Sequence, residues 1–325
     1  MKIMSFDLLH LAAVALVALS WFLLRPLAAA PQSASFRCLK KDEGTFKKVK
    51  FNPRHIFGIG LSYAQHIAET AHDYDSQAVP AVFVKANATL VPGGGDVPYP
   101  TQADLKSAAD KMQGGLGAEL AQRYGEIPPL MDYEAELGFI LLTDISDEDL
   151  RDPAFVPKLG FFIANDLSSR SMQILGEGTP DRLGYWGMSK SFTGFLPVTK
   201  QIYVPDEETA DAIPCVTLKT LVNGELRQNE KTSGMIYTPR QMLAAARSTY
   251  PNLALKKGDL FITGTPGGIA LSTPRWKARL ASLLRFSRFT KLKFVLKADQ
   301  NKFLKSGDEI EVSGEWLGKV TSRVR

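Results

Sequence analysis

Two glutamates separated by one residue form the densest chemical feature of the sequence. Glu134 and Glu136 stand in the run Asp-Tyr-Glu-Ala-Glu-Leu at 132–137, which leads into the apolar run Leu137–Leu142. On a strand, both side chains project from the same face because the side-chain period is two. Like charges at this spacing require a cation, and carboxylate oxygens favour Mg²⁺, Mn²⁺ or Ca²⁺ over zinc. The alternative is a solvated strand face without a ligand.

A third acid, Asp166, follows the apolar run Gly160–Ile163 in the segment Ala-Asn-Asp-Leu-Ser-Ser-Arg at 164–170. An aspartate at the end of a buried strand is often only a turn-former or a helix N-cap. By itself, Asp166 therefore does not extend the pair of glutamates into a metal site.

Eight short motifs follow one another along the chain, and their order carries more information than any one of them. They are Gly-Leu-Ser-Tyr-Ala-Gln-His-Ile-Ala-Glu (60–69), Phe-Val-Lys (83–85), Asp-Tyr-Glu-Ala-Glu-Leu (132–137), Ala-Asn-Asp-Leu-Ser-Ser-Arg-Ser-Met-Gln (164–173), Lys-Ser-Phe (190–192), Val-Asn-Gly-Glu-Leu-Arg-Gln (222–228), Thr-Gly-Thr-Pro-Gly-Gly (263–268) and Leu-Gly-Lys-Val-Thr-Ser-Arg-Val (317–324). In this order they resemble the fumarylacetoacetate hydrolase family over about Phe57 to Val324.

The resemblance implies a mixed β-roll that holds a divalent metal, Mg²⁺ or Mn²⁺, on Glu134, Glu136 and Asp166. It also implies that His66 and Glu69 activate a water molecule as catalytic residues in hydrolytic members. Their i, i+3 spacing lets both side chains share one helical face. An ordinary surface helix is the alternative interpretation of this pair.

Two lysines and a glycine-rich turn complete the site that the resemblance implies. Lys190, as a catalytic group, and Lys85, as a substrate-binding group, are expected to hold a substrate carboxylate or enolate. Without the resemblance, each would be an ordinary lysine that reaches solvent. Gly264 and Thr265 are expected to bind substrate, because glycine allows backbone N–H groups to approach a ligand closely. A plain tight turn is the alternative.

The sequence departs from the family pattern at positions that are not implied metal ligands. Relatives usually carry Asn and Asp within the segment that here reads Ser62–His66, and Asp where Ser171 and Thr193 stand. These departures concern the substrate and the tuning of the site.

The function implied by the resemblance is a metal-dependent hydrolase. It would cleave a C–C bond of an acylpyruvate-like 2,4-dioxo acid and leave a pyruvate-type enolate and a carboxylic acid. A decarboxylase or isomerase of a 2-oxo acid on the same metal site is the alternative among enzymes. A non-catalytic, membrane-associated scaffold is the alternative from another class. The resemblance also implies a homodimer.

Short apolar runs bounded by turn residues dominate the body, so the elements that position these groups are mostly strands. Predicted strands are Ala81–Lys85, Leu137–Leu142, Phe161–Ala164, Val216–Val222, Asp259–Ile262 and Glu309–Val312; predicted helices are Gln102–Gln113, Leu116–Tyr124, Pro239–Ser248 and Arg275–Phe289. Regular alternation of strand and long helix is absent, which argues against a doubly wound or TIM-type sheet. The expected fold class is strand-dominated α+β, a mixed β-roll of the fumarylacetoacetate hydrolase C-terminal-domain type with one N-terminal transmembrane helix.

The N-terminal segment is the source of the predicted transmembrane helix. Leu8–Leu24 is apolar except for His10 and Ser20, and as a helix it would span roughly 26 Å, just short of a bilayer core. A cleaved secretory signal and a buried core helix are the alternatives. More basic residues follow the span than precede it, which predicts a single-pass protein of the cell membrane with its catalytic domain facing the cytoplasm.

The expected organisation places an anchor or signal with its linker at 1–30 and the catalytic domain at 36–325, with helical insertions near 101–130 and 272–294. The formal net charge is +5, but the stretch 275–305 alone carries ten basic residues and one acid, which leaves −4 for the rest. This distribution argues against nucleic-acid binding and favours one basic helix in contact with membrane lipid, with a solvated helix as the alternative. The two cysteines, Cys38 and Cys215, are too few for a disulfide framework, and packing is their expected role.

Overall fold

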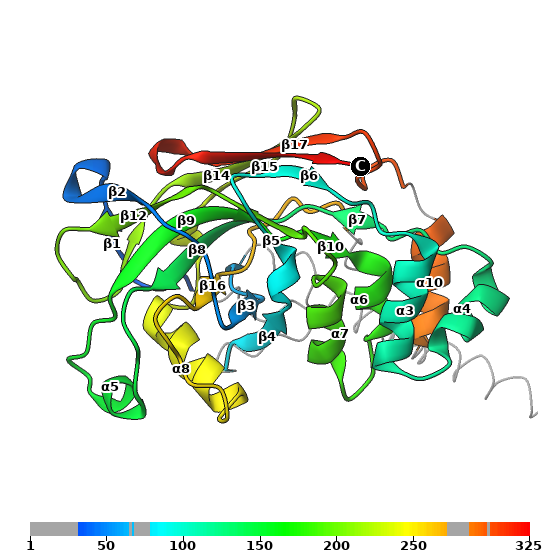
Figure 1. Ribbon diagram of the computed structural model, residues 1–325, viewed down its shortest axis with the longest axis horizontal. Coiled ribbons are helices and arrows are strands. Elements are labelled where there is room, and N and C mark those ends of the chain that lie inside the picture. Colours follow the sequence, from blue (N-terminus) through cyan, green and yellow to red (C-terminus); the bar gives the residue numbers. More distant parts are fainter. Residues whose placement is uncertain (1–31, 65–66, 68–78, 272–285, 298–299) are drawn as a thin grey trace, which may run out of the picture.

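The apolar runs of the sequence form the strands of two stacked β-sheets, with helices gathered at one end and beneath them (Figure 1). The structure is a computed structural model that describes residues 32–64, 67, 79–271, 286–297 and 300–325. The two sheets pack face to face, and one apolar core with members from both lies between them.

The larger sheet has nine strands, most of them antiparallel. Its main path is β2 (Gly44–Lys48), β12 (Gln201–Pro205), β9 (Leu159–Asn165), β8 (Ala135–Leu141), β16 (Leu260–Ile262), β3 (Ile56–Gly60) and β4 (Ala81–Lys85), and β11 (Leu196–Val198) joins β9 to β5 (Leu90–Pro92).

The smaller sheet has five strands and lies on the larger one. Its order is β15 (Glu225–Lys231), β14 (Thr217–Val222), β17 (Glu309–Gly314), β18 (Lys319–Val324) and β6 (Gly95–Val97). Two further pairs are the parallel β1 (Arg37–Leu39) with β13 (Ala212–Pro214) and the antiparallel β7 (Met131–Asp132) with β10 (Ser168–Ser169).

Strands β8 and β9 are buried along their whole length on both faces. Leu137 and Ile163 belong to the core between the sheets, whereas Ile140 and Phe162 belong to a second core on the opposite face. Double burial explains why these strands are continuous apolar runs rather than alternating ones. It also means that a charged side chain at the end of either strand has little access to water.

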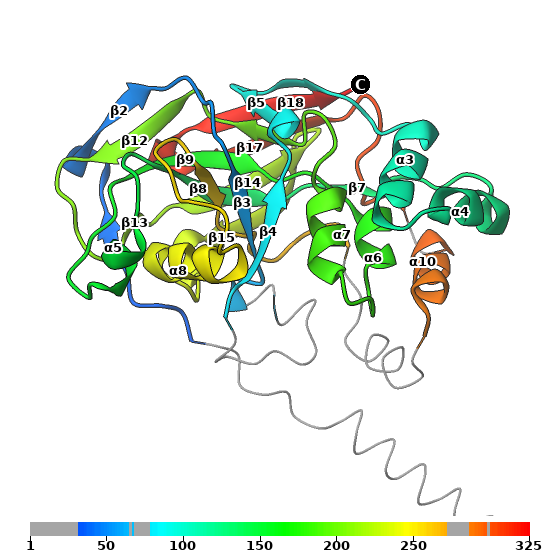
Figure 2. The same ribbon diagram turned by 60° about the horizontal axis from the view of Figure 1, so that its bottom comes forward.

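Seven helices and four short 3₁₀ segments are described, and the helices form two groups (Figure 2). One group, at one end of the sheets, has its own small core and contains α3 (Gln102–Met112), α4 (Leu116–Tyr124), α6 (Arg170–Leu175), α7 (Arg182–Ser189) and α10 (Arg288–Lys297). The other contains α5 (Asp147–Arg151) and α8 (Pro239–Thr249), and the 3₁₀ segments are η1 (Lys41–Glu43), η2 (Asn87–Thr89), η3 (Thr232–Gly234) and η4 (Glu315–Leu317).

The described part of the chain contains no helix that is long and apolar enough to cross a membrane. The longest helices there, α3 and α8, have 11 residues each, which is roughly 16 Å and about half of a bilayer core. The predicted span, Leu8–Leu24, lies outside the described residues. The predicted transmembrane helix, and with it the single-pass location in the cell membrane facing the cytoplasm, is therefore corrected: the fold is strand-rich α+β, without support for a membrane span.

Only the end of the predicted basic helix lies within the described residues. A helix was expected over Arg275–Phe289, but the described helix is α10, which begins at Arg288, and residues 272–285 lie outside the description. The Arg288 guanidinium donates to the Leu175 carbonyl and to the Tyr185 hydroxyl, at 3.2 and 3.1 Å. This arginine therefore fastens α10 to the helical group instead of standing free for lipid headgroups.

The predicted packing role of the two cysteines is wrong. Cys38 of β1 and Cys215, the residue after β13, form a disulfide with Cα atoms 5.0 Å apart. The bond spans 177 residues of sequence and uses both cysteines of the chain. It fastens the first strand to a connection that leads directly into the five-stranded sheet.

Breaking this disulfide should lower the stability of the protein. Because the bond closes a long loop, the Cys38→Ser, Cys215→Ser double variant should lose about 2 to 4 kcal/mol in its free energy of unfolding, as measured by urea denaturation. Dithiothreitol should lower the free energy of unfolding of the parent protein by a similar amount and leave that of the double variant unchanged. A parent midpoint that reductant does not move would contradict the assignment.

Candidate metal centre

The pairing of β8 with β9 brings three carboxylates together. Ala135 faces Asn165 across the ladder, and the Asp166 N–H donates to the Glu134 carbonyl at 2.9 Å. Glu134, Glu136 and Asp166 each offer a carboxylate oxygen, and these oxygens all lie within 4.8 Å of one another. We call these three residues the acid triad. All of them are buried, so the alternative of a solvated strand face does not apply.

Two lysines, each reaching the triad from a different element, partly neutralise it. Lys190, the C-terminal cap of α7, donates to Glu134 Oε2 and Asp166 Oδ2, both at 2.6 Å, and to the Ser168 hydroxyl at 2.8 Å. Lys85, the last residue of β4, donates to Asp166 and to the Phe195 carbonyl. Both lysines are buried, contrary to the alternative that they extend into solvent.

Arg170 and Asp132 form a second layer that the sequence reasoning did not identify. The Arg170 guanidinium donates to Asp132 Oδ2 at 2.8 Å and to Glu134 Oε1 at 2.6 Å. Asp132 in turn accepts the backbone N–H groups of Ala270 and Leu271 at 2.9 and 3.1 Å. Asp132 and Arg170 lie within the motifs at 132–137 and 164–173. A charged residue next to predicted metal ligands was the one feature of the sequence that could have pointed to their role.

The electrostatics leave one carboxylate without a cation of its own. Among the described residues Glu136 forms no ion pair, although the Gly264 N–H donates to its Oε2 at 2.7 Å. Burial raises the pKa of Glu136 well above its usual range, and the charges of Asp166 and Glu134 raise it further. Burial opposes the charge of Lys190, but Asp166 and Glu134 outweigh this effect and leave its pKa raised.

The donor set fits a hard divalent cation. The cluster contains four buried carboxylates, counting Asp132, against three cationic side chains, and all three triad ligands are oxygens. Oxygen-only sets of this kind suit Mg²⁺ or Mn²⁺. Such an ion on Glu134, Glu136 and Asp166 would offset the burial and the repulsion that raise the pKa of Glu136.

The turn at 263–268 lies against the triad, and its geometry requires glycine. Gly264 has a φ of 85°, and a Cβ there would lie 2.7 Å from the Ile59 carbonyl oxygen. The Thr265 hydroxyl donates to the Ala135 carbonyl at 3.1 Å. Gly264 and Thr265 thus lie beside the carboxylates, and their substrate-binding role stays a prediction.

The predicted dyad, His66 and Glu69, lies outside the described residues. Its neighbour Ser62 is buried and its hydroxyl donates to the Thr263 carbonyl, at the start of the turn. The segment that leads to the dyad is therefore adjacent to the site, and the catalytic roles of the two residues stay predictions.

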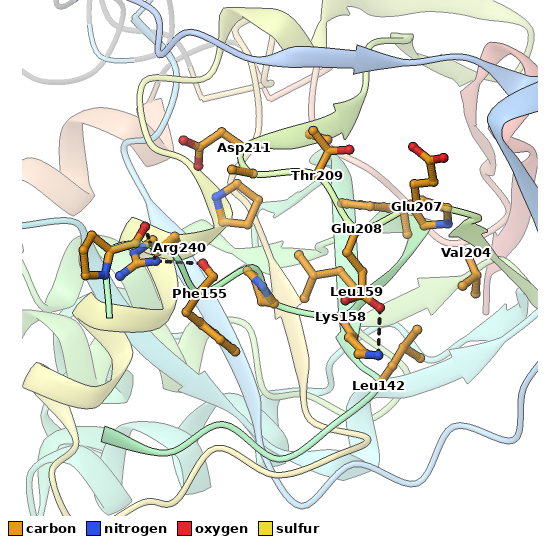
Figure 3. A pocket seen from close by; sticks show the side chains of 17 residues that line it. Leu142, Phe155, Lys158, Leu159, Val204, Glu207, Glu208, Thr209, Asp211 and Arg240 are labelled. Atoms are coloured by element: carbon orange, nitrogen blue, oxygen red, sulfur yellow. Dashed lines mark hydrogen bonds and ion pairs between the residues drawn. The ribbon is translucent and has the colours of Figure 1, made fainter. Parts of the chain in front are cut away.

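A separate cavity of about 240 Å³ lies away from the triad, between the connections that follow α5 and β12 and the start of α8 (Figure 3). Leu159 and Phe161 are among its apolar walls. Two of its charged side chains have partners within the lining: Lys158 pairs with Glu208 at 2.8 Å, and Arg240 donates to the Phe155 carbonyl at 2.8 Å. None of the predicted site residues that the structure describes lines it.

The fold and the acid triad define a fumarylacetoacetate hydrolase-type protein. The sequence model described as "Fumarylacetoacetate (FAA) hydrolase C-terminal" matches residues 55–325, and the chain belongs to this family.

Similar proteins carry several activities in their names. The mitochondrial oxaloacetate tautomerase FAHD1 of Rattus norvegicus is 29% identical over 218 residues, which are 66% of this chain and 81% of the relative. The oxaloacetate tautomerase YisK of Bacillus subtilis (strain 168) is 25% identical over 275 residues, which are 83% of this chain and 69% of the relative.

Solved structures show the same fold. The fumarylacetoacetate hydrolase of Exiguobacterium antarcticum has a TM-score of 0.52 at 24% identity, covering 86% of this chain and 77% of its own. The 5-carboxymethyl-2-hydroxymuconate delta-isomerase of Mycobacterium smegmatis has a TM-score of 0.51 at 20% identity, covering 85% and 80%. The family thus contains hydrolases, isomerases and tautomerases. The predicted hydrolysis is one of these three activities, and the comparisons do not single it out.

Removing a triad carboxylate should strongly weaken metal binding. Glu136→Gln should weaken Mn²⁺ affinity, measured by isothermal titration calorimetry, by more than the roughly 10- to 100-fold that loss of an outer partner costs. Glu311→Gln, at a glutamate on β17 that pairs with Lys319 at the surface, is the control and should bind as the parent does. Equal affinities in all three proteins would refute the site.

Proposed function

We propose that the protein is a divalent-metal-dependent enzyme that forms the enolate of a 2-oxo acid, with tautomerisation of an oxaloacetate-like acid as its reaction. The observation that carries the proposal is the buried acid triad, with one uncompensated carboxylate and two lysines on its other oxygens. The relatives named as oxaloacetate tautomerases, at 25% and 29% identity, support this choice of substrate class.

Mg²⁺ or Mn²⁺ would be held by Glu134, Glu136 and Asp166. When bound, the ion would supply a Lewis acid that stabilises the negative charge of the enolate. The remaining chemistry belongs to the side chains around it.

Lys190 is proposed to stabilise the enolate oxygen. Its raised pKa keeps the ammonium charged, and its three N–H donors now serve Glu134, Asp166 and Ser168. If one of these hydrogen-bond partners were replaced by the enolate oxygen of the substrate, the Lys190 ammonium would lie beside the atom on which negative charge develops. Burial lowers the pKa of Lys85, although Asp166 opposes this effect, and Lys85 is proposed to bind the substrate carboxylate.

Hydrolysis of an acylpyruvate-like acid is the second candidate, because His66 and Glu69 match the water-activating pair that the family resemblance implies, and their i, i+3 spacing lets both side chains share one helical face. Both reactions share the enolate, but only hydrolysis needs an attacking water. The homodimer and the contact with membrane lipid also stay predictions.

Loss of Lys190 should reduce turnover far more than it reduces metal binding. Lys190→Met should lower kcat/KM by roughly 100-fold or more, because it removes a buried charge aimed at the reacting oxygen. The assay follows decay of the enol absorbance of oxaloacetate with Mg²⁺ present. Lys319→Met, at a surface lysine, should behave as the parent does. Undiminished activity in Lys190→Met would exclude the proposed role.

The dyad separates the two reactions. If the protein hydrolyses acylpyruvates, His66→Ala and Glu69→Ala should abolish cleavage, detected by NMR of the products, while Mn²⁺ affinity stays near that of the parent. If tautomerisation is the reaction, the parent should show no acylpyruvate cleavage. Parallel loss of metal binding in the dyad variants would show that these residues are ligands instead.

A further inference from the structure

Gln228 joins the strand of the acid triad to the turn at 263–268, although it belongs to neither. It lies on β15, at the edge of the five-stranded sheet, and is the one buried residue of that strand. Its side chain is 1% exposed. A buried carboxamide must have its hydrogen bonds satisfied, so its partners show which parts of the molecule it holds.

A bulge in the β14–β15 ladder determines where Gln228 faces. Thr220 pairs with Gln228, but the next residue, Leu221, pairs with Leu226, so Arg227 is an extra residue on β15. Such bulges re-aim side chains and are frequent beside active sites. Here the bulge leaves Gln228 facing inward with its buried partner Thr220.

The oxygen of the carboxamide binds the backbone between Glu134 and Glu136. Gln228 Oε1 accepts the Ala135 N–H at 2.9 Å and the Thr220 hydroxyl at 2.8 Å. Ala135 separates Glu134 from Glu136, so this contact fixes the chain between the two glutamates.

The nitrogen of the carboxamide holds the turn. Gln228 Nε2 donates to the Thr265 hydroxyl at 2.9 Å and lies 3.2 and 3.4 Å from the carbonyls of Gly267 and Pro266. The orientation of the amide is unambiguous, because a backbone N–H only donates and a backbone carbonyl only accepts. One side chain therefore holds both parts of the site.

Direct bonds between the turn and β8 complete the arrangement. The Thr265 hydroxyl donates a hydrogen bond to the Ala135 carbonyl, and the Gly264 N–H donates to the Glu136 carboxylate. The Glu134 carboxylate has separate support from Arg170 and Lys190. Loss of Gln228 would therefore release the turn while leaving these supports of the carboxylates in place.

We infer that Gln228 is a positioning residue that sets the turn, and through it the substrate, relative to the acid triad. The inference rests on the proposed function and on the predicted role of Gly264 and Thr265 in binding its substrate. It assigns Gln228 an effect on substrate affinity that is separate from metal affinity.

The test uses the full chain and two variants of Gln228. Gln228→Met keeps the length and apolar volume but removes every hydrogen bond, and it should raise KM about tenfold while kcat changes less. Gln228→Glu keeps an oxygen that can accept the Ala135 N–H, but it replaces the donating Nε2 with a second oxygen that faces the oxygens of the turn. It should therefore raise KM at least as much as Gln228→Met does. Mn²⁺ affinity should stay within about threefold of the parent in both.

Thr220→Val is the matched control, because it removes a buried hydrogen bond to Gln228 Oε1 but none to the turn. Its KM should equal that of the parent. Equal rises of KM in Thr220→Val and Gln228→Met, or a loss of metal affinity as large as the rise in KM, would overturn the inference. If Gln228→Met does not fold, by circular dichroism, Gln228→Glu carries the same comparison.

A binding measurement keeps this test separate from the proposed function. Oxalate is a small dianion that mimics the carboxylate and oxo oxygens of a 2-oxo acid. Calorimetry with the Mn²⁺-loaded protein should show about tenfold weaker oxalate binding in Gln228→Met than in the parent and in Thr220→Val. If the parent converts no 2-oxo acid, the proposed reaction fails, and oxalate binding still decides the role of Gln228: equal affinity in all three proteins would refute it.

Discussion

The antiparallel pairing of β8 with β9 places Glu134 and Glu136 beside Asp166 in a region that water hardly reaches. Burial of unpaired carboxylates is among the most expensive arrangements in a protein. The surrounding structure therefore has to supply positive charge and hydrogen-bond donors next to these carboxylates. This requirement explains why buried lysine and arginine side chains lie beside them.

The cations that answer this requirement come from separate parts of the chain. Lys85 ends β4, Arg170 begins α6, and Lys190 caps α7. Because each is fixed by a different element, the charge balance of the centre exists only once the sheet and the adjoining helices have assembled. The centre is thus a product of the whole fold, and its remaining negative charge is what makes it suitable for an added cation.

Local patterns predicted a substantial part of this arrangement. The period of two placed Glu134 and Glu136 on one face, and turn residues gave β4 and α4 the bounds that the structure has. The short α6 and α7 were not predicted, because six or eight residues give little periodicity and α7 contains two glycines, which are poor helix formers.

Long-range contacts were beyond the reach of local patterns. The ion pair of Arg170 with Asp132 joins residues 38 apart, and the bond from Ala135 to Gln228 joins residues 93 apart. The disulfide spans 177 residues. Neither side of such a contact carries a local sign of the other, so the single cysteines resembled ordinary packing residues. The membrane span was predicted from hydropathy alone, without any contact to support it.

The disulfide also changes the covalent topology of the chain. With the bond between Cys38 and Cys215 in place, the backbone is a closed ring with two tails. The acid triad and its three cations all lie on the ring, whereas Gln228 and the turn at 263–268 lie on the C-terminal tail. A single backbone cut within the ring would open it without releasing a fragment. Without reductant, one cut can separate the carboxylates from the turn only on the C-terminal side of Cys215.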